Sequence, residues 1–95
     1  SLTDQLPSRP VIWTLRAERE LAAIRAYIGA VNPLAAHRLA LRLVATAADL
    51  AEMPERFRAA GPDRELVIVR PYIIRYRITQ EAIVILRVRH GARRG

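Results

Sequence analysis

The apolar residues of this 95-residue chain change their periodicity just beyond its middle, and this change restricts the possible folds more than any other feature. Up to residue 53 they recur at the spacing of amphipathic helices, and from residue 66 they form the continuous or alternating runs typical of strands. Pro54 and Gly61-Pro62 separate the two regions. Helices followed by strands predict an α+β domain in which a helical pair packs on an antiparallel sheet.

Two helices are predicted in the first part of the chain. The first begins after Thr14, a favourable N-cap, and extends to about residue 29. The second begins at Asn32-Pro33, because asparagine suits the N-cap and proline suits the first turn, and it extends to about residue 53. The buried face of the first helix would consist of Leu21, Ile24, Ile28 and Val31. The core stripe of the second would consist of Ala36, Leu39, Leu43, Ala47 and Leu50.

Four strands are predicted, one before the helices and three after them. They cover residues 11–13, 66–69, 72–79 and 82–89. The last three follow one another through short links and must therefore be antiparallel. The order is β-α-α-β-β-β in one domain over residues 11–95, preceded by a loose leader at residues 1–10. The aromatic residues that are most simply read as core are Trp13, Tyr27, Tyr72 and Tyr76.

The last two strands can pair in two registers, depending on the length of the turn around residues 80 and 81. A two-residue turn would place Tyr76 opposite Ile85. A three-residue turn would place Arg77 opposite that isoleucine and Arg75 opposite Arg87. We favour the second register, because glutamine and glutamate suit a tight two-residue turn poorly and because this register separates an apolar face from a basic one. The core face would then consist of Ile74, Tyr76, Ile78, Val84, Leu86 and Val88.

The chain carries 16 basic residues, all arginine, against 9 acidic ones, for a net charge of +7. This charge favours an acidic partner such as a nucleic acid or an acidic protein. Facing arginines at 75 and 87 would repel each other, which is easiest to understand if an anionic partner binds there. An exposed face kept soluble by its arginines is the open alternative. The candidate target-binding residues are Arg75, Arg77, Arg87, Arg89, Arg93 and Arg94.

Several chemistries find no support in the residues. The chain has no cysteine, and its two histidines, His37 and His90, are far apart, so we expect neither a metal nor a cofactor. The four glycines are isolated and form no phosphate loop. No apolar run is long enough to cross a membrane, and we expect a cytoplasmic protein. His90 lies beside arginines and would suit a general acid or base, although a lone histidine is more often structural.

The second predicted helix has more apolar surface than one core needs. Leu34, Leu41 and Val44 extend the apolar arc beyond the core stripe. This arc could contact a partner or pack beneath the leader of the chain itself.

The order and spacing of several short motifs resemble toxins of the ParE/RelE superfamily from bacterial type II toxin-antitoxin systems. The resemblance covers nearly all of the domain. Its motifs are Val-Ile-Trp-Thr at 11–14, Tyr-Ile at 27–28, Asn-Pro at 32–33, Arg-Glu-Leu-Val at 64–67, Pro-Tyr at 71–72, Tyr-Arg at 76–77, Ile-Leu-Arg-Val at 85–88 and His-Gly-Ala-Arg at 90–93.

The resemblance implies one of two targets. ParE-like members poison DNA gyrase and need no nuclease site, whereas RelE-like members cleave messenger RNA on the ribosome. Ile73 stands where the RelE branch carries a strand arginine, and the residues after His90 lack the terminal helix and tyrosine of that branch. We therefore expect a gyrase inhibitor. In the alternative, His90 would be the acid or base of a nuclease, and Arg87 or Arg93 would stabilise the transition state.

The resemblance also implies an antitoxin partner. A ParD-like antitoxin would wrap the toxin with its C-terminal segment and would be the only link between the toxin and operator DNA. The residues expected to contact it are Trp13, Leu34, Leu41 and Val44. An interaction module that has lost its toxicity is a third possibility.

Overall fold

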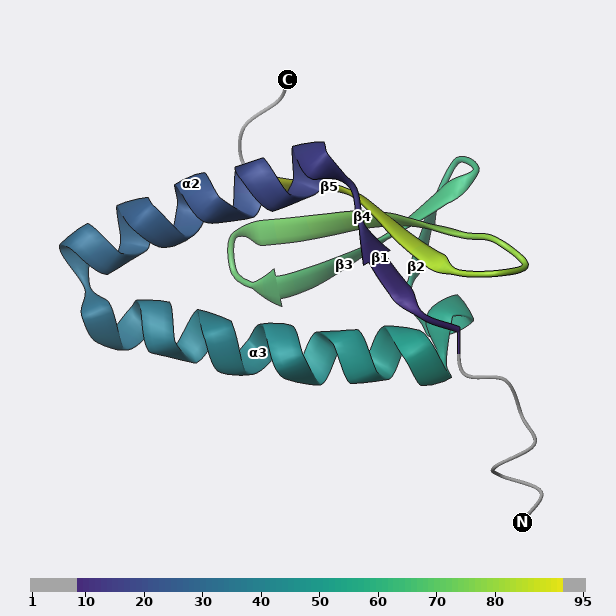
Figure 1. Ribbon diagram of the computed structural model, residues 1–95, viewed down its shortest axis with the longest axis horizontal. Helices are drawn as coiled ribbons and strands as arrows, with labels where there is room; N and C mark the ends of the chain where they lie inside the picture. The colour runs from purple at the N-terminus through teal and green to yellow at the C-terminus, as the bar shows by residue number, and fades with distance from the viewer. Residues whose placement is uncertain (1–8, 92–95) are drawn as a thin grey trace, which may run out of the picture.

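The computed structural model describes residues 9–91, which form an α+β fold with two helices on a five-stranded sheet (Figure 1). The chain runs through β1 (Val11–Trp13), α2 (Leu15–Val31), α3 (Pro33–Glu52), a 3-10 turn (Pro54–Arg56), β2 (Arg58–Ala60), β3 (Asp63–Val69), β4 (Tyr72–Ile78) and β5 (Ile83–His90). The strand order in the sheet is β1-β5-β4-β3-β2. The predicted fold class and all six predicted elements are confirmed, and β2 is an additional strand.

The predicted caps explain where the two helices begin. The Thr14 side chain accepts a hydrogen bond from the Ala17 N–H at 3.1 Å, and the Asn32 side chain accepts one from the Ala35 N–H at 3.2 Å. The first helix continues past its predicted end at Gly29, because the Asn32 N–H still bonds to the Ile28 carbonyl at 2.7 Å. Local side-chain chemistry therefore fixes both helix starts, whereas of the two helix ends only that of the second helix was predicted closely.

The sheet is mixed rather than wholly antiparallel. Strands β3, β4 and β5 are antiparallel, as predicted, but β1 runs parallel to β5, with Val11 beside Ile83 and Trp13 beside Ile85. Both helices and three strands separate β1 from β5, so no tight turn dictates their relative direction. The edge strand β2 pairs only with the first three residues of β3, across a turn in which Gly61 has a φ of +63°.

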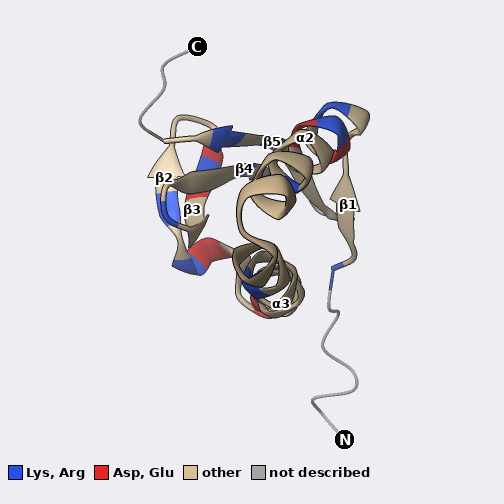
Figure 2. Cartoon of the chain, turned by 90° about the vertical axis from the view of Figure 1, so that its left-hand side faces the viewer, with Lys and Arg blue, Asp and Glu red and all other residues tan. Residues whose placement is uncertain are grey.

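The core lies between the sheet and the helical hairpin, which covers one face of the sheet (Figure 2). The Tyr76 hydroxyl is buried and donates a hydrogen bond to the Pro54 carbonyl, which ties β4 to the end of the helical region. Val31 was expected in the core but is 71% exposed, because it lies at the tip of the hairpin. The buried core residues are Ala17, Leu39, Leu50, Leu66, Ile68, Ile74, Tyr76, Ile83, Ile85 and Val88.

Strands β4 and β5 use both of the registers considered from the sequence. Next to the turn, Tyr76 lies opposite Ile85, which is the two-residue-turn register. Further along, Arg75 lies opposite Arg87, which is the other register. Leu86 is the extra residue between the two parts and forms a β-bulge.

The bulge corrects part of the predicted core. Arg77 lies opposite Val84 rather than Ile85. Ile83 and Ile85 are buried, whereas the predicted core residues Val84 and Leu86 are only partly buried. The prediction failed here because it assumed one uninterrupted register. Among the described residues, no helix is long and apolar enough to cross a membrane.

Candidate functional site

The bulge at Leu86 determines which way the arginines of β5 project. Alternation from the buried Ile83 and Ile85 would direct Arg87 and Arg89 into the core. The extra residue reverses the alternation, so that Val88 is buried and Arg87 and Arg89 lie on the opposite, outer face of the sheet, where Arg87 still reaches Glu20 on α2. Arg75 shares this outer face, because it lies directly opposite Arg87.

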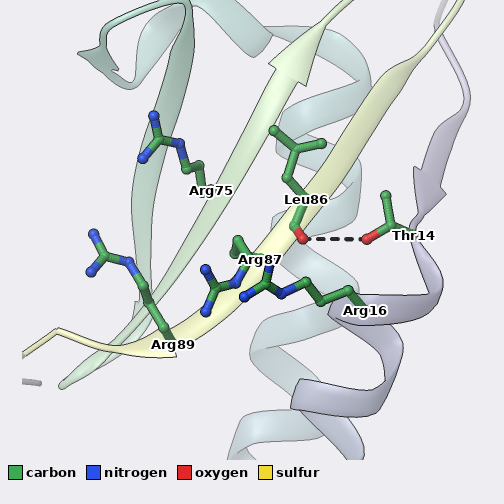
Figure 3. A pocket seen from close by; sticks show the side chains of 6 residues that line it. All are labelled: Thr14, Arg16, Arg75, Leu86, Arg87 and Arg89. Carbon is green, nitrogen blue, oxygen red and sulfur yellow. Dashed lines mark hydrogen bonds between the residues drawn. The ribbon is translucent and has the colours of Figure 1, made fainter. Parts of the chain in front are cut away.

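These arginines surround a hollow of about 580 Å³, which we call the arginine hollow (Figure 3). It lies where α2 begins beside the bulge, and the Thr14 hydroxyl donates a hydrogen bond to the Leu86 carbonyl at 3.3 Å on its rim. Arg16 reaches the hollow from the first turn of α2. The lining residues are Thr14, Arg16, Arg75, Leu86, Arg87 and Arg89.

Asp63 holds two of the candidate arginines. Its Oδ2 atom accepts a hydrogen bond from the Arg75 Nε at 2.9 Å, and its Oδ1 atom accepts one from the Arg77 Nε at 2.6 Å. The side chain is only 5% exposed. The hydrogen bond from Arg77 is the main cause that lowers the pKa of Asp63, with a further contribution from Arg75, while burial opposes the shift.

Glu20 and Glu65 hold the arginines of β5. The Glu20 carboxylate accepts hydrogen bonds from the Arg87 Nε at 2.9 and 3.1 Å and from the Val88 N–H at 3.0 Å. Partial burial raises the pKa of Glu20, but these bonds outweigh it and leave the pKa below its ordinary value. Glu65 accepts a hydrogen bond from the Arg89 Nη2 at 3.0 Å.

These carboxylates change the interpretation of the facing pair Arg75 and Arg87. The predicted pairing is confirmed, but each of the two arginines binds a carboxylate of this same chain. Their mutual repulsion is thus relieved internally, and it does not by itself indicate a bound partner.

His90 belongs to a second hollow, of about 560 Å³, on the helix-facing side of the sheet. It lies opposite Tyr72, and the two rings meet edge to face with centroids 5.5 Å apart. Arg89 borders both hollows, whereas Arg87 borders only the first. The residues lining the second hollow are Glu20, Ala23, Ile24, Tyr27, Tyr72, Val88, Arg89 and His90.

The chain next to His90 is closely packed. The Gly91 N–H donates a hydrogen bond to the Pro71 carbonyl at 2.6 Å, and a Cβ atom at residue 91 would lie 2.9 Å from that oxygen. Such a Cβ would also lie 2.7 Å from the Ile73 Cδ1. Glycine at this position is therefore required by the close approach of β4. Arg93 and Arg94 lie outside the described residues.

Three of the four residues expected to contact an antitoxin lie on the exposed face of α3, which we call the α3 apolar face. They are Leu34, Leu41 and Val44, with exposed fractions of 58%, 59% and 73%. Trp13 is on β1 instead, where it packs partly buried against the core.

Sequence reasoning missed several residues of the site. Arg16, which is not among the candidate residues from the sequence, lines the arginine hollow. Tyr27, expected in the core, is 67% exposed beside His90. The 3.6-residue periodicity could have shown that Tyr27 lies next to Glu20 and Ile24 on one helix face. Over residues 9–91, no three His, Asp or Glu side chains group as metal ligands would.

Comparisons with known proteins agree on the family of this chain. Toxin RelE2 of Caulobacter vibrioides is 55% identical over 84 residues, which cover 87% of this chain and 96% of that protein. Toxin RelE1 of the same bacterium is 34% identical over 85 residues, covering 85% of this chain and 91% of that protein. A chain of the chromosomal ParDE system from P. aeruginosa shares the fold, with a TM-score of 0.72 at 21% identity, over 87% of this chain and 96% of that chain.

The family model agrees with these relatives. Residues 11–95, which include every helix and strand described above, match the model for the ParE toxin of the type II toxin-antitoxin system, parDE. The chain therefore belongs to the ParE toxin family of type II toxin-antitoxin systems.

Proposed function

We propose that this toxin inhibits DNA gyrase and that a ParD-like antitoxin neutralises it in the cytoplasm. The observation that carries this proposal is the separation of His90 from Arg87. The two residues project from opposite faces of β5 and border different hollows. A nuclease needs its acid or base and its phosphate-stabilising cation around one scissile bond. A protein that traps gyrase needs only a binding surface, which the outer arginines supply.

The gyrase proposal is tested by supercoiling inhibition with the wild-type toxin and with His90→Ala. His90 lies away from the arginine hollow, so both proteins should inhibit gyrase at similar concentrations. Inhibition that disappears with His90→Ala, in a variant shown to be folded by circular dichroism, would contradict the proposal. Failure of the folded wild-type toxin to inhibit active gyrase would contradict it more directly.

A ribosome-dependent endoribonuclease is the second candidate, and two observations favour it. The relative with 55% identity bears the name RelE2. His90 shares its hollow with Arg89 and with the Tyr72 ring, so a general acid or base and a cation do lie side by side. In this case messenger RNA on ribosomes would be cut, and His90→Ala would remove most of the cleavage. Arg93, the other candidate cation, gives this candidate no further support, because it lies outside the described residues.

The α3 apolar face supports an antitoxin interface. Its three large apolar side chains are more than half exposed on one helix, an arrangement that an amphipathic segment of a partner can cover. Acidic residues of that segment would be attracted by the positive charge of the toxin. Sequence-specific contact with operator DNA would then be made by the antitoxin.

Two single substitutions test this interface. Leu41→Asp and Val44→Asp should each weaken antitoxin binding by about tenfold or more, because each places a charge in an apolar contact. Val67→Asp is the matched control, since Val67 is 49% exposed on β3 and outside the α3 apolar face. Binding measured by calorimetry that is equal for all three variants would refute the interface.

A further inference from the structure

The arginine hollow retains positive charge after all its internal ion pairs are counted. Over the described residues, five arginines on this side of the molecule share three carboxylates, so the group has a surplus of cations. None of the three carboxylates lines the hollow itself. Four guanidinium groups from α2, β4 and β5 therefore face one concave surface (Figure 3). Positive charges concentrated in a hollow attract an anionic ligand.

The internal ion pairs also fix these guanidinium groups in place. Asp63 binds Arg75 at its Nε, and Glu20 binds Arg87 at its Nε and Nη2. The structure records no hydrogen bond from the Nη1 of either arginine within residues 9–91. A guanidinium has five N–H donors, so each arginine keeps donors for a ligand. Because the side chains are already ordered, a ligand binding them loses less entropy.

The arrangement suits a polyanion better than a single carboxylate. The cations continue beyond the hollow to Arg77 on the same outer face, and α2 directs the positive end of its dipole toward the rim. A nucleic acid backbone presents charges at about 1.7 Å intervals along a duplex, and its oxygens match the fork of a guanidinium. No aromatic residue lines the hollow, so bases have nothing to stack on.

We propose that the arginine hollow is a phosphodiester-binding site with which the toxin holds a nucleic acid backbone directly. The inference deepens the proposed function and rests on it for the biological source of the ligand, since gyrase holds DNA while the toxin acts. The hollow binds without base specificity, because its contacts are with the backbone. It binds without cleavage, because no histidine or carboxylate lines it to move a proton near neutral pH.

Fluorescence anisotropy without gyrase tests this site. The probes are a labelled single-stranded DNA, the duplex of the same sequence and the corresponding RNA, each measured over a range of salt concentrations. The wild-type toxin should bind all three and leave all three uncut. Its affinity should fall with salt by a slope that reports the number of phosphate contacts.

Arg16→Ala is the informative variant. Its side chain is 66% exposed and its nearest carboxylate oxygen is 3.9 Å away, so its removal leaves the fold intact. Duplex affinity should fall about tenfold, as expected for one charge-assisted contact, and the salt slope should fall by about 0.9. Arg38→Ala is the matched control, because Arg38 is exposed on α3 and does not line the hollow. The duplex affinity of the Arg38→Ala protein should stay within about twofold of wild type, apart from the general effect of net charge.

Four results would overturn the site. They are no binding of any probe at low salt, equal losses in the two arginine variants, cleavage of a probe by the wild-type toxin, and tighter binding of an aspartate-rich peptide than of the three nucleic acids. Because gyrase is absent, such a result leaves gyrase inhibition untouched. Conversely, a toxin that does not inhibit gyrase could still show the expected nucleic acid binding by anisotropy.

Discussion

Thr14 links the start of α2 to the bulge that directs the arginines outward, and Thr14→Val tests that link. Its hydroxyl accepts a hydrogen bond from the Ala17 N–H at 3.1 Å and donates one to the Leu86 carbonyl at 3.3 Å. Valine has nearly the same shape but has no hydroxyl, so both hydrogen bonds are lost. The substitution therefore removes the helix cap and leaves the carbonyl of the bulge without this donor.

The expected destabilisation follows from these two losses. Removing an N-cap side chain costs about 1 kcal/mol, and leaving a partly buried carbonyl without its donor adds about 1 kcal/mol. At about 4–8 °C per kcal/mol for a domain of this size, the Tm should fall by about 8–16 °C.

Thermal unfolding followed by circular dichroism measures this loss. Thr14→Ser is the matched control, because serine keeps the hydroxyl and should preserve most of the stability. A Thr14→Val protein with the wild-type Tm, or a serine variant as unstable as the valine variant, would refute the role assigned to the hydroxyl.

Three further predictions concern the core and the carboxylate cluster. Arg77 and Arg75 lower the pKa of Asp63 below its ordinary 3.8, so the stability it contributes is present above that pH and is lost as the pH falls through the folded-state pKa. Urea unfolding from pH 2 to 6 should show this acid-dependent loss in wild type and a weaker one in Asp63→Asn. Burial raises the pKa of Tyr76 from 10.0 to about 12, so the stability it contributes is present below pH 10 and is lost as the pH rises to 12. Tyr76→Phe should flatten this alkaline loss in the same assay, at the cost of the bond to Pro54. Gly91→Ala should lower stability by about 1–3 kcal/mol in denaturant unfolding, because its Cβ would overlap the Pro71 oxygen and Ile73.

The helices and most of the sheet could be predicted because their signals are local. The caps at Thr14 and Asn32 are read from the residues around them, and the alternation of β4 is a period of two. Strand β2 was missed because its three residues, Arg58–Ala60, show no apolar alternation and are ordered by pairing with β3. Its existence depends on a neighbour that follows it in the chain.

The site was harder to predict because its decisive contacts join distant residues. Glu20 and Arg87 are 67 positions apart, and no local pattern shows that they meet. The bulge at Leu86 is a second case, since turn rules give one register for the whole hairpin and the structure uses two. The sequence therefore identified the outer arginines but not the carboxylates that hold them, nor the contribution of Arg16.

The central claim is that gyrase, not messenger RNA, is the target. The most direct measurement is the amount of linear DNA that gyrase accumulates on supercoiled plasmid as purified toxin is added, with ribosomes translating a defined message assayed in parallel. Our account predicts linear DNA that increases with toxin, disappears when the antitoxin is added, and is accompanied by an intact message. Unaffected gyrase together with a message cut on the ribosome would contradict it.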